Sequence, residues 1–291
     1  MSASTPVDEA YRSHRPYLIN LAYQMLGDIG EAEDVVQETF LRLARVDATE
    51  IDDVRAWLTV AAGRLCLDQI RSARMRHEQP DVDDRLQDVR APQPDPADRV
   101  TLDDQVSRAL LEVLRRLSPA ERVAFVLHDI FGMPFAEIAD TVGRSVGTCR
   151  QLARRARAKF TDATPRRADI NDTEHRRVVD TFITACANGD LQALTAVLDP
   201  AVWGAGTVLG ADVPRQINHG VDDVAVNLLR YLGHGATLVS GPAGQPVLLA
   251  FAERRLFAVL VLTIRDGRIL KIEASVDPSA AGRRRSGPVE F

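Results

Sequence analysis

The stretch VGRSVGTCRQLARRARAKF, residues 142–160, gathers positive charge in a chain that is acidic as a whole. It holds six basic residues and no acidic one, while the chain of 291 residues carries a formal net charge of -5. Gly143 predicts a turn, and Ser145 is a typical residue before a helix that begins at Val146. On this helix an apolar stripe recurs every three or four residues and is expected to face the core. The stripe consists of Cys149, Ala153, Ala156 and Phe160.

The other side of the same helix is polar and basic. Opposite the stripe fall Thr148, Gln151, Leu152 and Arg155, and they are flanked by Arg150, Arg154 and Arg157. A solvated face normally mixes charges of both signs, so an all-basic face favours a nucleic acid as partner. Arginines at the flanks can neutralise phosphates, while Thr148, Gln151 and Arg155 can reach base edges in the major groove.

The residues before this helix complete a helix-turn-helix. Ser118 and Pro119 predict a helix start, Gly132 predicts its end, and residues 135–142 predict a short helix before the turn. A short helix, a glycine turn and a capped basic helix form a DNA-binding motif shared by repressors, activators and sigma factors. The motif predicts DNA binding without naming the class of regulator.

Composition excludes several other classes of protein. The negative net charge argues against a protein that coats nucleic acid by its overall charge, so DNA would have to be bound by the local basic segment, residues 142–160. The three cysteines, Cys66, Cys149 and Cys186, are too few and too far apart for a disulfide framework or a zinc site. The N-terminus has no signal-peptide pattern, and the longest apolar run, residues 256–262, is too short to span a membrane. We therefore expect a cytoplasmic protein with no membrane partner, metal or cofactor.

The first part of the chain is predicted to be helical. Asp28, with Glu31 three residues later, predicts the start of a helix with one apolar side. The other side is mostly acidic and presents Glu33, Asp34, Gln37, Glu38 and Arg42. The next predicted helix, residues 54–76, ends in several arginines, which the helix dipole explains only in part. From Glu78 to Asp98 proline and aspartate accumulate, which predicts an extended linker.

Together these segments resemble the extracytoplasmic-function (ECF) sigma factors of the sigma-70 family. The segments GEAEDVVQETFLRL (residues 30–43) and RAWLTVAAGRLCLDQIRSARMR (residues 55–76) resemble region 2. After the acidic linker, LSPAERVAFVLHDIFGMPFAEIADTVGRSVGTCRQLARRAR (residues 117–157) resembles region 4. The resemblance implies a protein that binds core RNA polymerase, at the β′ clamp helices and the β flap, and directs it to promoter DNA.

The resemblance also implies roles for three sets of residues. Polymerase binding maps to Asp34, Gln37, Glu38 and Arg42. Recognition and melting of the minus-ten element map to Arg64, Asp68, Arg71, Arg74 and Arg76. Recognition of the minus-thirty-five element maps to Arg144, Ser145, Thr148, Arg150, Gln151, Arg154 and Arg155. Two positions depart from the family's pattern, because Leu152 stands where many members have a basic residue and Gly63 where many have asparagine.

The last part of the chain predicts a further domain. Val179, Phe182, Ile183 and Cys186 form a helical stripe. Later apolar runs predict strands at residues 246–252, 256–264 and 268–276, the last two joined by a turn at Asp266 and Gly267. Helices followed by an antiparallel sheet predict an α+β fold, in which a curved sheet closes with the helices into a cone with a pocket. The glycines between Trp203 and Gly210 are interpreted as a loop.

This order resembles the SnoaL-like (NTF2-like) domain, chiefly through FITACANGDLQALTAVLDPAV (residues 182–202) and DGRILKIE (residues 266–273). The whole chain thus resembles the sigma-factor group with a fused SnoaL-like domain, often called group 41, in which that domain regulates the sigma factor. Some related domains are enzymes, and His219 with Asp222 or Asp212 would supply an acid and base. Their surroundings are equally typical of a turn and a helix start, so we favour a regulatory or ligand-sensing pocket over catalysis.

We therefore predict a multidomain protein with two all-α sigma domains and a C-terminal α+β SnoaL/NTF2-like cone. The predicted boundaries are 1–78 for region 2, 79–98 for the linker, 99–163 for region 4, 164–174 for a second linker, 175–282 for the SnoaL-like domain and 283–291 for a tail. The predicted function is that of an alternative sigma factor, not an enzyme, whose own C-terminal domain modulates it, with a small ligand in that domain as a further expectation. The alternative is a one-component, ligand-sensing regulator that uses the helix-turn-helix alone.

Overall fold

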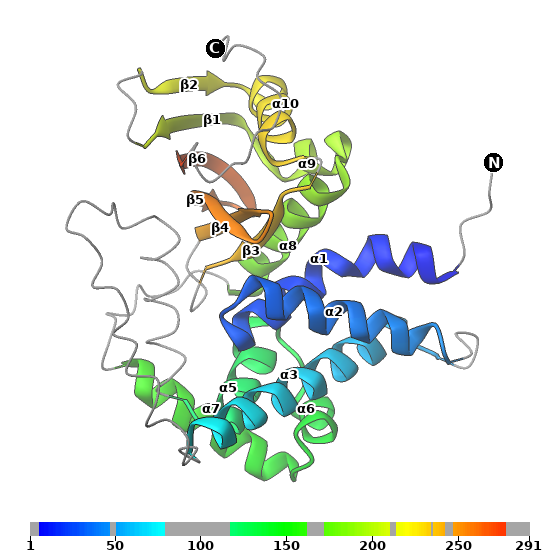
Figure 1. Ribbon diagram of the computed structural model, residues 1–291. Coiled ribbons are helices and arrows are strands. Elements are labelled where there is room, and N and C mark those ends of the chain that lie inside the picture. Colours follow the sequence, from blue (N-terminus) through cyan, green and yellow to red (C-terminus); the bar gives the residue numbers. More distant parts are fainter. Residues whose placement is uncertain are drawn as a thin grey trace, which may run out of the picture.

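Two helical units precede an α+β unit along the chain (Figure 1). The computed structural model describes residues 6–46, 51–78, 117–161, 172–209, 214–233, 235–241 and 247–277. The multidomain architecture predicted from the sequence is confirmed. The predicted linker at 79–98, most of the linker at 164–174 and the tail at 283–291 lie outside the described residues.

The first unit packs three helices, α1 (Pro6–Leu26), α2 (Ile29–Leu43) and α3 (Val54–Glu78). Helix α2 begins where the sequence predicts, because the Asp28 side chain accepts a hydrogen bond of 2.8 Å from the backbone N–H of Glu31. Such a cap satisfies one of the N–H groups that a helix start leaves without an intrahelical partner. The apolar side of α2 is buried, which turns the acidic side predicted from the sequence outward.

The second unit contains α5 (Pro119–Phe125), the π-helical turn η2 (Val126–Ile130), α6 (Phe135–Val142) and α7 (Val146–Thr161). Ser118 and Glu121 form a reciprocal capping box at the start of α5. Gly132 and Gly143 both adopt the left-handed backbone conformation, with φ of 69° and 67°, at the two predicted turns. The predicted helix-turn-helix is therefore present, and the π-helical turn is the feature that the sequence analysis missed.

The third unit combines three helices with a six-stranded sheet of order β2-β1-β6-β5-β4-β3. The helices are α8 (Asp172–Asn188), α9 (Leu191–Val197) and α10 (Val221–Leu232). The strands are β1 (Leu198–Val208), β2 (Gln216–His219), β3 (Thr237–Ser240), β4 (Val247–Ala252), β5 (Arg255–Arg265) and β6 (Arg268–Val276). The expectation of a wholly antiparallel sheet was wrong for one pair, because β1 and β6 run parallel. Parallel pairing needs a long crossover, which the chain between these strands supplies.

The predicted loop between Trp203 and Gly210 was also wrong, because most of it belongs to β1. A Cβ atom placed on Gly204 would lie 3.8 Å from a methyl group of Val224 on α10, an ordinary van der Waals distance, and one placed on Gly206 would meet no atom within 4 Å. Packing therefore does not require glycine at either position.

Both faces of the sheet are covered around β3, β4 and β5. Leu248 and Ala250 pack in the cluster formed with the helices of the third unit. The alternate residues Leu249 and Phe251 pack in the cluster formed by the first two units, where the Phe251 and Tyr23 ring centroids are 5.4 Å apart. Burial on both faces explains why β4 is a continuous apolar run without strict alternation.

A buried polar network joins α1 to β3. Asn20 Oδ1 accepts hydrogen bonds from the Ser240 backbone N–H at 2.8 Å and from its hydroxyl at 2.9 Å. The Gln24 side-chain amide donates to the Ser240 carbonyl oxygen. The Asn20 and Gln24 side chains are each 2% exposed. The first and third units therefore share one core with matched polar groups, a contact that periodicity alone does not predict.

The substitution Asn20→Ala is expected to lower the free energy of unfolding by about 1–3 kcal/mol, because the buried N–H of Ser240 would lose its acceptor. The midpoint of urea unfolding measures this change. The control Asn188→Ala, at an exposed helix end, is expected to stay close to wild type. Equal midpoints for the two variants would contradict the role given to the network.

Candidate nucleic-acid interface

Helix α7 carries a basic face on its outer side. The Ser145 hydroxyl accepts a hydrogen bond of 3.2 Å from the Thr148 N–H, which caps the helix at the predicted residue. The stripe residues Cys149, Ala153 and Ala156 are fully buried. The side chains predicted to meet the minus-thirty-five element are all exposed: Arg144, Ser145, Thr148, Arg150, Gln151, Arg154 and Arg155.

Two basic residues of the same helix form ion pairs with acidic residues of the second unit. Arg157 Nε lies 2.5 Å from Asp129 Oδ1, and Lys159 Nζ lies 2.7 Å from Glu121 Oε2. Burial would raise the pKa of Glu121, but hydrogen bonds from Lys159 and Ser118 outweigh it and lower this pKa. The C-terminal half of α7 is thus held by ion pairs, and Arg157, predicted to flank the DNA-facing side, is paired with Asp129 through Nε while its side chain stays 43% exposed.

Leu152 was predicted to lie on the side of α7 opposite the core, and this was wrong. Its side chain is half-buried and packs against the core cluster of the first two units. Helix α7 contacts both α5 and α6, so the surface it buries is wider than one stripe. This explains an apolar residue at a position where a basic one was expected.

The face of α3 that carries Arg64 packs against α6 of the helix-turn-helix. Arg64 Nη2 donates a hydrogen bond of 2.9 Å to the Asp140 carbonyl oxygen. One residue earlier, a Cβ atom on Gly63 would lie only 2.8 Å from Thr141 Cγ2, so glycine permits this close approach. Farther along α3, Asp68 and Arg71 are exposed and 3.9 Å apart. The side chains of Arg74 and Arg76 lie outside the described part of the structure.

The acidic side of α2 is touched by the third unit. On this helix Asp34, Gln37 and Arg42 are exposed, and Arg42 Nε donates to Glu38 Oε1 at 2.9 Å. Arg254, in the turn between β4 and β5, donates to Asp34 Oδ1 at 2.8 Å. The predicted polymerase-binding residues therefore lie on one helix face, and one of them is paired with the C-terminal unit.

Comparisons with known proteins agree with this arrangement. Residues 10–76 match the family Sigma-70 region 2, and residues 107–160 match Sigma-70, region 4. The chain is 50% identical over 288 residues to the probable ECF RNA polymerase sigma factor SigI of Mycobacterium tuberculosis, with 96% of each chain covered. The chain belongs to the ECF RNA polymerase sigma factors.

A second relative of this sigma factor is the ECF RNA polymerase sigma factor SigJ of Mycobacterium tuberculosis, 35% identical over 93% of this chain and 90% of that one. The crystal structure of SigJ matches 94% of this chain and 97% of that chain at 29% identity, with a TM-score of 0.37. Family membership confirms the resemblance drawn from the sequence. It also favours the sigma factor over the one-component regulator, because both helical regions are matched.

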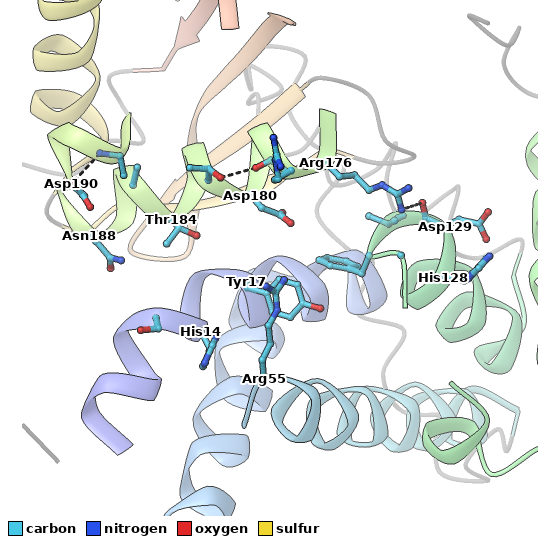
Figure 2. Close-up of a pocket in the computed structure, with 18 residues that line it drawn as sticks. His14, Tyr17, Arg55, His128, Asp129, Arg176, Asp180, Thr184, Asn188 and Asp190 are labelled. Atoms are coloured by element: carbon cyan, nitrogen blue, oxygen red, sulfur yellow. Dashed lines mark hydrogen bonds between the residues drawn. The ribbon is translucent and has the colours of Figure 1, made fainter. Parts of the chain in front are cut away.

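A cavity of about 910 Å³ lies where the three units of the sigma factor meet (Figure 2). His14 and Tyr17 of α1 line one wall with Arg55 of α3, whose guanidinium carbon is 4.2 Å from the centre of the Tyr17 ring. Asp180 and Arg176 of α8 line the facing wall. Burial raises the pKa of Asp180 to about 6, although Arg55 and Arg176 act in the opposite direction. Burial, followed by the charge of Arg55, lowers the pKa of His14.

The candidate acid and base of the C-terminal unit are open to water. His219 and Asp222 are both exposed, and Asp212 lies outside the described residues. Among the residues that the structure describes, no three His, Cys, Asp or Glu side chains are grouped to hold a metal ion. All three cysteines are buried, and burial raises the pKa of Cys186 to about 12. Within the described ranges, no helix is both long and apolar enough to cross a bilayer.

The substitution Asp180→Asn is expected to stabilise the protein above pH 6, by about 1–3 kcal/mol. The folded-state pKa of Asp180 is raised to about 6, so the folded protein favours the protonated carboxyl. The stability that the wild-type side chain contributes is therefore fully present below about pH 4 and is lost as the pH rises through 6. The gain from asparagine should therefore vanish at low pH, as thermal unfolding midpoints from pH 4 to 8 would show. The control Asp190→Asn alters an exposed carboxylate of the same cavity. A gain from Asp180→Asn that does not depend on pH would refute this account.

The substitution Gly63→Ala is expected to push α3 away from α6, because the new methyl group would meet Thr141 Cγ2. Thr141→Ser removes that methyl group and keeps the hydroxyl that donates to Glu137 at 3.1 Å, so the double variant should restore the contact. Energy transfer between dyes on cysteines introduced at the exposed positions 45 and 158 measures the separation. An unchanged separation in Gly63→Ala, or a double variant as open as the single one, would contradict the prediction.

Proposed function

We propose that this chain binds core RNA polymerase, directs it to a set of promoters, and is modulated in this by its own C-terminal unit. The observation that carries the proposal is the exposed arginine-rich face of α7, within a helix-turn-helix that packs against a second helical unit. Both helical units match sigma-70 regions, and an operator-binding regulator would have no need of region 2.

Helix α7 reads the minus-thirty-five element in this proposal. Its outer arginines neutralise phosphates, and Thr148, Gln151 and Arg155 reach base edges. The residues assigned to this element are Arg144, Ser145, Thr148, Arg150, Gln151, Arg154 and Arg155. The assignment is supported by their common exposure and by the absence of acidic residues on this helix.

Helix α3 and the residues before it recognise and melt the minus-ten element. Unstacking a base costs a few kcal/mol, which contacts in a protein pocket and charge neutralisation offset. The residues assigned to this element are Arg64, Asp68, Arg71, Arg74 and Arg76. The outer side of α2, with Asp34, Gln37, Glu38 and Arg42, binds the clamp helices of the β′ subunit, and region 4 binds the β flap.

The two DNA-reading units must separate on a promoter. The two elements lie about 25 base pairs apart, which is roughly 85 Å along B-DNA at about 34 Å per ten base pairs. In the structure α3 and α6 touch through Gly63 and Thr141, so the arrangement is a closed one. The C-terminal unit shares a core with region 2 and contacts the second unit through Arg176 and the Asp129 carbonyl oxygen, which supports its role as a regulator of opening.

In this proposal the C-terminal unit regulates and does not catalyse, which is supported by the exposure of His219 and Asp222. A small ligand of the C-terminal unit is part of the proposal. The 910 Å³ cavity differs from the predicted pocket inside that unit, because α8 lines only one wall and a molecule held there would touch all three units. The protein acts in the cytoplasm in this proposal. Its domains follow the predicted boundaries except that the C-terminal unit begins with α8 at Asp172, inside the predicted linker 164–174.

Reconstitution with core RNA polymerase tests the proposed function. The full chain is expected to confer promoter-selective initiation, measured as run-off transcripts from a library of promoter fragments. The proposal fails if polymerase gains no selectivity while the protein alone binds a palindromic site tightly.

The substitution Arg155→Ala is expected to reduce initiation about tenfold at promoters that depend on the minus-thirty-five element, because a base contact is lost. Arg177→Ala, which removes an exposed arginine on α8, is the matched control. Transcript yield and DNase protection of the element measure the effect. If the two variants initiate equally well, Arg155 is not a base-reading residue.

A further inference from the structure

The turn between β4 and β5 holds two non-glycine residues in the left-handed region. Glu253 has φ of 50° and Arg254 has φ of 64°, between the paired residues Ala252 and Arg255. A two-residue hairpin turn with positive φ at both positions is type I′, which favours Asn-Gly or Asp-Gly. Side chains other than glycine adopt this conformation at a cost, and they retain it where the surrounding structure holds them.

The neighbouring hairpin provides an internal comparison. The turn between β5 and β6 has the same form, with φ of 50° at Asp266 and 71° at Gly267. Here the sequence is Asp-Gly, the favoured pair for a type I′ turn. The chain therefore uses favoured residues in one hairpin and a strained pair in the next, so the strained pair calls for a local reason.

The reason lies on α2. Arg254 Nη2 donates to Asp34 Oδ1 at 2.8 Å, and Arg254 Nε donates to Glu33 Oε2 at 3.1 Å, so one guanidinium engages two carboxylates. Gly30 makes room for it, because a Cβ atom there would lie 3.1 Å from Arg254 Nη1. We name this contact of Arg254 with Glu33 and Asp34 the clasp. A favoured Asn-Gly turn would have no side chain at position 254 to form it.

We propose that Arg254 competes with RNA polymerase for Asp34, so that the clasp must open before the acidic face of α2 can bind the clamp helices. This inference rests on the function proposed for that face. Asp34 cannot be paired with Arg254 and with a polymerase residue at the same atoms, and the hairpin tip stands over it while the clasp is closed.

The exposure of the clasp fits a competitor that can be displaced. The Arg254 side chain is 54% exposed and that of Asp34 is 64% exposed, so the contact is weak and sensitive to salt. Docking of the sheet does not need it, because Asn20 and Ser240 already fix the sheet to α1 in a buried network. The strained turn is therefore better explained by the contact of Arg254 with Asp34 than by a need to dock the sheet on α1.

The double substitution Glu253→Asn with Arg254→Gly removes the clasp and at the same time relieves the backbone strain of the turn, because Asn-Gly is a favoured pair for type I′. The full-length variant is expected to bind core RNA polymerase about three- to tenfold more tightly than wild type at low salt, because the competitor is gone. Its thermal midpoint should be equal or higher, so the gain would not come from unfolding. Glu33→Gln, which weakens the clasp and leaves Asp34 intact, should give a smaller gain. Asp266→Asn changes the other type I′ turn and is the control expected to match wild type.

Binding is measured by fluorescence anisotropy of labelled protein titrated with core polymerase. The difference between the double variant and wild type should shrink at about 0.5 M salt, where exposed ion pairs are screened. Equal and measurable affinities at low salt would overturn the clasp and leave the proposed function standing. If neither form binds polymerase, the proposed function fails and the clasp fails with it.

Discussion

The hydrogen-bonded contact between Ser240 on β3 and the pair Asn20 and Gln24 on α1 fixes the arrangement of the chain. These groups are buried and matched, so the apolar surfaces around them can stay in contact without leaving a donor or acceptor unpaired. The network sets the position of the sheet on α1, and three other features follow from it. It buries the second face of β4, brings the hairpin tip to α2, and leaves the cavity between α1 and α8.

Contacts of two kinds hold the three units together, and they differ in how easily they are released. The junction of α1 with the sheet is apolar and buried, with the Tyr23 and Phe251 rings in contact. The contacts at the faces assigned to polymerase and the minus-ten element are small or exposed: Arg254 on Asp34, and Gly63 with Arg64 against α6. Exposed ion pairs contribute little and are screened by salt, whereas buried matched groups are costly to separate. A partner that opens this protein therefore meets the least resistance at the functional faces, while the C-terminal unit stays on α1.

Local signals in the sequence predicted the helical part of the fold well, because helix ends depend on neighbouring residues. Caps at Asp28, Ser118 and Ser145 lie where the pattern placed them. Strand β1 was missed because glycines are depleted in strands and favour a loop interpretation, while its pairing with β6 involves residues distant in the chain. Arg254 was missed for a related reason, since its partners lie more than two hundred residues away and no periodicity links them. The exposure of the predicted DNA-reading side chains of α7 followed from periodicity, but the pairing of Asp34 with Arg254 and of Arg64 with the Asp140 carbonyl oxygen did not.

The helix faces assigned to the two promoter elements differ in their contacts within the protein. The outer face of α7 is exposed along its predicted contact residues, because its core stripe is satisfied within its own unit and its ion pairs lie near its C-terminal end. On α3 the assigned residues Arg64, Asp68 and Arg71 are exposed too, but the Arg64 guanidinium is bonded to the Asp140 carbonyl oxygen beside the close approach of Gly63 to Thr141. Separation of the helical units would therefore release Arg64 and leave the surroundings of the α7 residues unchanged. An acidic chain with a local basic helix can thus expose that helix in the closed arrangement, while one arginine of the face assigned to the minus-ten element is held by the contact between the two helical units.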